Sequence, residues 1–322
     1  MRGYVIKRLL QMIPLVLGVT IIVFSILHFA PGSPLLAMVD PLTTTPAEIA
    51  EAERQLGLDQ PVPVQYVRWL GQMLRGNLGY SFLTGRSVSD LILRRLSPTL
   101  VLSLTAMMIS YLIALPIGIA SALRRYSFMD RVTTTLSLGG ISVPAFFLAL
   151  LFVYFFGLRL NLFPTSGYGT LGGTATGLAL WLDRLPYLIM PAFVLSITPM
   201  AGIVRYVRSS MMDTLSEDYI RTARSKGLSE RTVIYKHALR NSLIPVITLL
   251  GLRLPEIFGG AYVIEYIFDW PGMGTLAIQS VHNREYSIVM SITLVTASLV
   301  MIGNLMADVM YAVADPRIRL DE

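Results

Sequence analysis

Residues 209–245, SSMMDTLSEDYIRTARSKGLSERTVIYKHALRNSLIP, are polar and basic, whereas long apolar runs precede and follow them. The stretch is too charged to cross a bilayer. Ser216, followed by two acids, predicts the start of a helix, and Gly227 predicts its end. Ser229 predicts the start of a second helix that runs toward Arg240. We therefore expect two short helices, joined at a glycine corner, that project as a knob.

The composition is that of a membrane protein. Of the 322 residues, 54% are hydrophobic and 14% are charged, and the mean hydropathy is +0.62. Taken together, these three values lie far from the usual composition of soluble domains. The chain has no cysteine, which excludes disulfides, thiolate catalysis and cysteine-bound metals. The formal net charge of +6 is explained by the topology described below, so nucleic-acid binding is disfavoured.

Six apolar runs match the roughly 20 residues that span a hydrocarbon core of about 30 Å. The first of them resembles a signal peptide in its basic start, but it is long and has no small-x-small cleavage site, so we expect a retained span. The runs are 9–30, 99–122, 132–158, 185–204, 241–264 and 286–307.

Lysine and arginine are distributed unequally between the two sides of these spans. Sixteen of the 26 lie before the first run, around residues 124–131, in the loop 205–240 or in the tail. Six more lie in the loop 31–98, where acids balance them. The positive-inside rule therefore places both termini and the loop 205–240 in the cytoplasm.

Two loops are expected on the outer side. In the first, Thr45, Pro46, Glu48 and Gly57 predict a capping-box helix, and residues 63–74 predict a second helix. This small element could receive a partner protein, or it could only pack on its own spans; both readings remain open.

The second outer loop, 159–184, contains glycine at positions 169, 172, 173 and 177. We expect an irregular outer loop there. A seventh span is the alternative, but the glycines weaken a helix, and a further crossing would move the C-terminal arginines to the outer side.

Several motifs together resemble one family. Arg221-Thr222-Ala223, then Gly227, then His237-Ala238-Leu239-Arg240, resemble the EAA loop of permease subunits in binding-protein-dependent ABC importers. The ending HALRN, followed by Ile244-Pro245, is similar to the oligopeptide, dipeptide and nickel branch. The sequence departs from the family pattern at Arg221, Thr222 and residues 237–240. Further similarities to this branch are 56–59 (LGLD), 65–66 (QY), 78–81 (LGYS), 259–261 (GGA), 270–274 (WPGMG) and 315–317 (DPR).

The resemblance implies an all-α membrane protein with the type I ABC importer permease fold. It implies six transmembrane helices, cytoplasmic coupling helices and a small helical outer-loop domain. An N-terminal region would cover 1–98, a transmembrane domain 99–313 with the coupling loop 205–240, and a cytoplasmic tail 314–322. The residues that it assigns to ATPase coupling are Ser216, Glu217, Asp218, Tyr219, Arg221, Ala223, Lys226 and Gly227.

The resemblance also implies partners and a location. The chain would work with a homologous second permease, two cytoplasmic ATPase subunits that hold ATP and magnesium, and an external solute-binding protein. It would lie in a prokaryotic plasma membrane. The substrate class implied is peptides, with nickel or oligosaccharide uptake by the same machinery as the alternative.

Charges near the fifth run are candidates for the translocation path. Arg253 and Glu256 lie one helical turn apart, and such groups at membrane depth usually face a bundle interior or a watery cavity. Two readings remain: the residues form an i,i+3 ion pair with each other, or Glu256 lines the translocation path and meets a cationic group of the substrate, such as a peptide amino terminus. Glu265 and Asp269 predict an outer gate, a binding-protein contact or simple helix capping. Asp308 could pair with a cytoplasmic arginine.

No enzyme site is predicted. The chain lacks the G-x-x-x-x-G-K-[ST] loop that cradles phosphates, so ATP hydrolysis is expected in partner subunits. Its three histidines, His28, His237 and His282, are scattered, which disfavours a metal site. An ion-coupled secondary transporter would show acidic or histidine relays in several spans and inverted repeats. A membrane scaffold would need no coupling knob.

Overall fold

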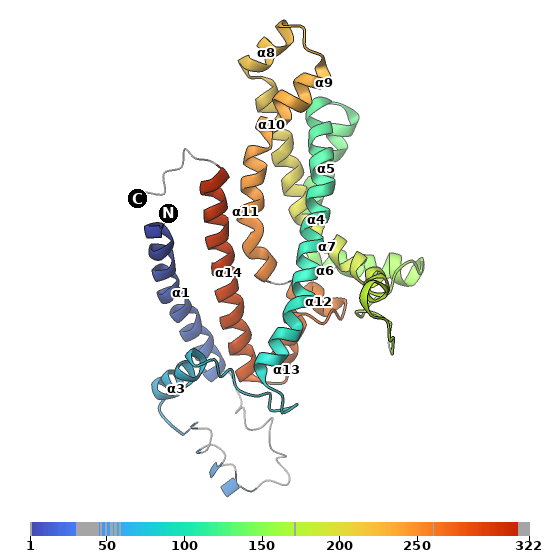
Figure 1. The fold of residues 1–322 in the computed structure, drawn as a ribbon. Helices are drawn as coiled ribbons and strands as arrows, with labels where there is room; N and C mark the ends of the chain where they lie inside the picture. The colour runs from blue at the N-terminus through green and yellow to red at the C-terminus, as the bar shows by residue number, and fades with distance from the viewer. Residues whose placement is uncertain are drawn as a thin grey trace.

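A computed structural model describes residues 2–29, 45, 47–48, 50–51, 54, 57, 59–170, 172–259 and 261–314. Its regular elements are helices, and the described residues contain a single isolated β-bridge, between Tyr80 and Ser87. The long helices run roughly side by side, and a knob of short helices projects from one end (Figure 1). We call this the knob end and the opposite one the far end. The predicted all-α membrane architecture is confirmed.

Four helices are long and apolar enough to cross a membrane by themselves. They are α1 (Arg2–Phe29), α4 (Val88–Leu123), α7 (Gly177–Leu215) and α14 (Tyr286–Ala314). If a further pair of helices, which is bent, is counted as one span, the described part of the chain contains up to five candidate spans. The helix of the fifth run, α11 (Ile244–Gly259), has 16 residues. The count of six spans therefore stays a prediction.

The core is built on the pairing of α4 with α7. Gly118 of α4 lies so close to α7 that an added Cβ would come within 2.8 Å of the Val207 Cβ. About two turns away, Ser110 donates a hydrogen bond across the interface to the Ser196 carbonyl at 3.1 Å. In a lipid bilayer the hydrophobic effect does not drive helices together, so their association depends on close packing. Small residues allow the helix backbones to approach closely. At intervals of four, α4 presents Ala106, Ser110, Ala114, Gly118 and Ala122.

The second group of long helices is α1, α11 and α14. The α1 start and the α14 end both lie toward the knob end (Figure 1). There Arg8 Nε is 3.2 Å from the Asp308 carboxylate, so the predicted pairing of Asp308 with an arginine is confirmed. The start of α1 and the end of α14 thus lie on the same side as the knob.

The third apolar run is not one straight span. It folds as α5 (Phe128–Ser142), then α6 (Ala145–Phe152), which continues as the π-helix η2 (Val153–Arg159). The pair is bent by 105°. Pro144 causes the break, because proline pushes the residue before it out of the helical region, and Val143 has φ −87° and ψ 126°.

The far-end loops are partly helical. The second predicted helix of the first loop is confirmed as α3 (Val62–Leu74). Thr45 N donates to the Glu48 carboxylate at 2.8 Å and Glu48 N donates to Thr45 Oγ1 at 3.4 Å, which is the predicted capping box. Pro46 lies outside the described residues, as does the tail from 315.

The prediction of an irregular loop as far as residue 184 was wrong. Helix α7 already begins at Gly177, because the glycines end there and a run rich in leucine follows. The fifth run is also shorter than predicted. It stops at Gly259, and two short helices follow: α12 (Tyr262–Ile267) and α13 (Met273–His282).

Candidate functional site

The knob consists of four short pieces that connect α7 to α11. They are α8 (Asp218–Ser225), α9 (Glu230–Thr232), the π-helix η3 (Val233–Ala238) and α10 (Leu239–Ser242). The predicted pair of helices joined at a corner is confirmed, and α8 lies at the tip (Figure 1). The predicted start was wrong by one residue. Ser216 closes α7, its hydroxyl donating to the Asp213 carbonyl at 2.7 Å, and Glu217 is the N-cap of α8.

One side of α8 is buried against the bundle. Ile220 is fully buried and Ala223 is 6% exposed. They pack with Ala122 at the end of α4, Met211 of α7 and Val233 of η3. Because Ala223 occupies this contact, the small residue of the EAA-like motif has a packing reason: a larger side chain would push α8 away from the bundle.

The remaining side of α8 faces outward. Of the eight predicted coupling residues, seven are exposed, and Ala223 is the buried one. Arg221 pairs with Asp218 along the helix at 3.3 Å, and both side chains are largely exposed. Tyr219 is 41% exposed and accepts a hydrogen bond from Asn241 Nδ2 at 3.1 Å. The face offers charge of both signs and an aromatic ring, which suits contact with a protein.

The corner after α8 depends on glycine. Gly227 has φ +77°, a conformation that costs an L-residue free energy, and no neighbouring atom lies within 4 Å of the position of its missing Cβ. Across the corner, Arg224 Nε donates to Glu230 at 2.7 Å. Ser229 Oγ accepts from Thr232 N at 3.4 Å, which confirms the predicted second cap. Backbone conformation and capping thus fix the angle at which α8 stands.

A buried ion pair supports the base of the knob. Asp130, at the start of α5, is 3% exposed and accepts from Arg208 Nε at 2.6 Å and Nη2 at 2.9 Å. Ser121 of α4 and the Tyr126 backbone also donate to this carboxylate. Sequence analysis missed the pair. The available signal was Ser127 followed by Asp130, a helix start that lies between two spans.

The fifth-run charges form the ion pair that was one of the two readings. Arg253 Nη1 lies 2.7 and 2.8 Å from the two Glu256 oxygens, and the side chains are 39% and 59% exposed. Both therefore lie on an open face of α11 in this chain, within two helical turns of its end at Gly259.

Glu265 is placed differently from Arg253 and Glu256. Its side chain is fully buried, so it lies on no accessible surface of the chain. Thr99 Oγ1 donates to Oε1 at 2.7 Å, and Gly274 N donates to Oε2 at 2.6 Å. Thr99 in turn accepts from Met273 N at 2.8 Å. The carboxylate joins α4, α12 and α13, and burial raises its pKa. These contacts favour the capping reading over a gate.

The glycines of Trp270-Pro271-Gly272-Met273-Gly274 serve this network. An added Cβ would come within 2.4 Å of the Glu265 carboxylate at Gly272 and within 2.3 Å of the Tyr262 Cα at Gly274. Only a residue without a side chain allows so close an approach. Within the residues that the structure describes, no three His, Cys, Asp or Glu side chains gather closely enough to hold a metal ion.

This architecture defines a multi-pass helical membrane protein with an exposed knob between two of its long helices. A family model described as binding-protein-dependent transport system inner membrane component matches residues 114–320, and the model for the N-terminal part of such components matches residues 1–105. The chain belongs to this family. It is a permease subunit of a binding-protein-dependent ABC transporter and works together with other subunits of that transporter.

Relatives match over the full length of the chain. The oligopeptide transport system permease protein AppB of Bacillus subtilis is 44% identical, with 99% of each chain covered. A putative peptide permease protein of Brucella suis is 46% identical, with 99% of this chain and 100% of the relative covered. The glutathione transport system permease protein GsiC of Salmonella paratyphi A is 40% identical, with 99% of each chain covered.

Proposed function

We propose that the chain forms part of the translocation path of an ATP-driven importer for peptides and that the knob couples this path to ATP hydrolysis. The peptide class is supported by the names of relatives that are 40–46% identical over the full length. The coupling role is carried by one observation: α8 is anchored by Ile220 and Ala223 and leaves its other side open at the tip of the molecule (Figure 1).

The proposed assembly contains a homologous second permease, two ATPase subunits that bind ATP and magnesium, and an external solute-binding protein. The knob end would face the cytoplasm of a prokaryotic cell. The positive-inside rule supports this orientation, because the knob end carries the basic loop 205–240 and the start of α1.

The knob would transmit force because it is rigidly joined to the bundle. In this proposal, ATP binding draws the two ATPase subunits together, and α8 moves with the ATPase surface on which it is docked. Ile220 passes the movement to the ends of α4 and α7. Moving a two-state bundle from 1:99 to 99:1 requires about 5.5 kcal/mol of differential binding, which nucleotide closure and a docked helix can jointly supply.

The clearest test is Gly227→Asp. A residue with a side chain disfavours φ +77°, so α8 should change its angle, and transport should fall while ATP hydrolysis continues. Gly76→Asp is a matched control, because Gly76 has φ +79° and equally open surroundings but lies just after α3. Normal coupling in a correctly inserted Gly227→Asp complex would contradict the proposal.

Glu256 is the residue that we propose meets the cationic end of a peptide in the path. Its side chain is 59% exposed and pairs with Arg253 on the same open face of α11. Glu256→Gln should raise the KM for peptides with a free amino terminus and leave N-acetylated peptides unaffected. Transport assays in proteoliposomes would measure this, and an unchanged KM for every peptide would remove Glu256 from the path.

A further inference from the structure

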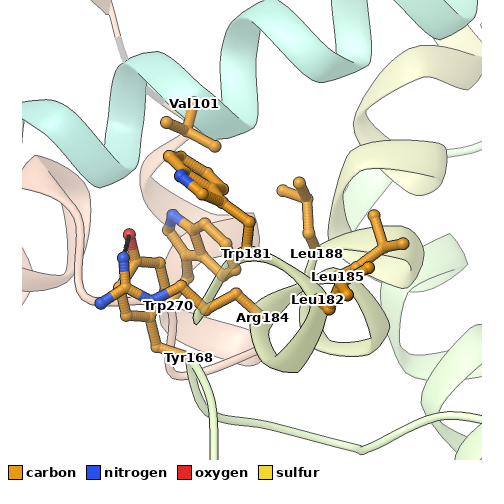
Figure 2. A pocket seen from close by; sticks show the side chains of 8 residues that line it. All are labelled: Val101, Tyr168, Trp181, Leu182, Arg184, Leu185, Leu188 and Trp270. Atoms are coloured by element: carbon orange, nitrogen blue, oxygen red, sulfur yellow. Dashed lines mark hydrogen bonds between the residues drawn. The ribbon is translucent and has the colours of Figure 1, made fainter. Parts of the chain in front are cut away.

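A pocket of about 170 Å³ lies between the start of α7 and the side of α4. In Figure 2 three leucines of α7 lie on one side of it, and the Trp181 indole extends toward Val101 of α4. Tyr168 and Trp270, whose rings meet edge to face at 4.7 Å, form the opposite side with Arg184. The walls are almost entirely apolar, and the lining residues are Val101, Tyr168, Trp181, Leu182, Arg184, Leu185, Leu188 and Trp270.

The pocket sits at the depth where hydrocarbon meets headgroups. Arg184 immediately precedes the apolar run 185–204, and Arg205 immediately follows it. Twenty helical residues span about 30 Å, the thickness of the hydrocarbon core. On α4 the apolar run begins at Thr99, beside Val101. Arg184 and Trp181 therefore lie at one membrane interface, where tryptophan and arginine are common.

Arg184 offers a positive charge that is not directly paired with a carboxylate in the described part of the chain. Its guanidinium stacks on the Tyr168 ring, 4.1 Å from the centroid, and donates to the Tyr168 hydroxyl at 3.1 Å. Across the described part of the chain, no carboxylate lies within ion-pair distance of it. The neighbouring Asp183 accepts from Thr170 N at 2.9 Å and from Thr170 Oγ1 at 2.5 Å, and it interacts with Arg184 only through space.

The pocket continues into an exposed apolar stripe on α4. Leu104, Met108 and Leu112 are 43%, 59% and 69% exposed and fall on the same helical face as Val101. From Val101 to Leu112 this face covers about 16 Å of helix at 1.5 Å per residue. The hydroxyl of Thr105 on this face already donates to the Val101 carbonyl at 2.7 Å, so a hydrocarbon chain matches the face better than the transported substrate does.

We propose that this pocket binds a phospholipid of the leaflet at the far end. The phosphate pairs with Arg184, and one acyl chain enters between Trp181 and the α7 leucines and continues along the α4 stripe. The bound lipid would hold the loop that carries Tyr168 against α4 and α7. The ligand that this site recognises is a phosphate anion joined to a long hydrocarbon chain, and the surrounding bilayer supplies it.

Tryptophan quenching tests the proposal on the full chain. The chain has three tryptophans, and Trp69→Phe leaves the two that line the pocket. The purified, delipidated protein in detergent is titrated with phosphatidylglycerol that carries brominated acyl chains. Saturable quenching is expected, and Arg184→Gln should raise the midpoint about fivefold, the effect of one arginine near a phosphate.

Arg159→Gln is the matched control. Arg159 also contacts a tyrosine, Tyr154, at 5.3 Å from the ring centroid, and it does not line the pocket. The Arg159→Gln variant should show the same quenching midpoint as the parent protein. Leu182→Glu, at a side chain that is 61% exposed, should weaken quenching without disturbing the fold. Equal midpoints for the Arg184 and Arg159 variants, unsaturable quenching, or displacement of the lipid by added peptide would each overturn the proposal.

Discussion

The knob and the far-end corner formed by α12 and α13 are both built from short helices that interrupt the long ones, yet they use polar residues in opposite ways. In the corner, Glu265 is fully buried, and Thr99 and Gly274 donate to its carboxylate. In the knob, Asp218 and Arg221 extend into open space. The buried Glu265 carboxylate of the corner is satisfied within the chain, whereas the charged side chains of α8 are available to another subunit.

The difference separates residues that hold the fold from residues that meet partners. A buried carboxylate that accepts several hydrogen bonds is costly to remove, because its donors lose their partner. An exposed ion pair contributes little to stability. We therefore expect substitutions in the corner to destabilise the chain and substitutions on the open side of α8 to change coupling alone.

The largest effect is expected for Glu265→Ala. The substitution leaves Gly274 N and the Thr99 hydroxyl without an acceptor and opens a cavity, which should cost about 4 kcal/mol. Thermal unfolding of the purified protein in detergent would measure the loss. Glu265→Gln keeps the shape and an acceptor for Thr99 and should cost clearly less. If Glu265→Ala were as stable as the parent, the hydrogen bonds to the buried carboxylate would not hold the corner together.

The next effect tests whether the base of the knob behaves like the corner. Asp130→Ala leaves the guanidinium of Arg208, whose side chain is 25% exposed, without its carboxylate. Removing one partner of a buried ion pair costs about 3 kcal/mol. Asp218→Ala removes an acid whose side chain is 95% exposed and should cause no measurable loss in the same unfolding assay. Equal stability of the two variants would contradict the distinction.

A smaller effect is expected for Gly274→Ala. Its Cβ would lie 2.3 Å from the Tyr262 Cα, so α12 and α13 must move apart, at a cost of about 2 kcal/mol. Gly139→Ala is the control, because no atom lies within 4 Å of its missing Cβ. A stabilised Gly274→Ala variant would show that the two helices are not in the close contact seen here.

The smallest effect on stability is expected for Arg221→Ala. Its side chain is 72% exposed, and surface substitutions usually change the free energy of unfolding by less than about 0.5 kcal/mol. The same variant should reduce the retention of ATPase subunits during purification. A large loss of stability with unchanged retention would assign Arg221 to the fold and not to the interface.

Much of the fold was predictable because hydrophobicity and capping act locally. The apolar runs predicted the long helices, and Gly227 and Ser229 predicted the corner of the knob. The bend at Pro144 was readable in principle, since proline restricts the residue before it. Ser216 was misassigned because serine also closes helices by donating to a carbonyl three residues back.

The site was predictable in position and less so in detail. The resemblance located the eight knob residues, but it could not tell that Ala223 faces inward while Arg221 faces outward. Arg208 lies 78 residues from Asp130 in the chain, and Thr99 lies 166 residues from Glu265. Contacts of such separation depend on the packing of whole helices, which local sequence patterns do not encode.

The central claim is that the open side of α8 is covered by an ATPase subunit. The chain has no cysteine, so Arg221→Cys creates a unique labelling site on α8. Its reaction rate with a polar maleimide would be measured for the purified chain and for the assembled transporter, with Arg86→Cys, at an exposed position far from the knob, as the control. The account predicts that assembly slows labelling at position 221 and leaves position 86 unchanged. Equal rates at position 221 in the free chain and in an intact complex would contradict it.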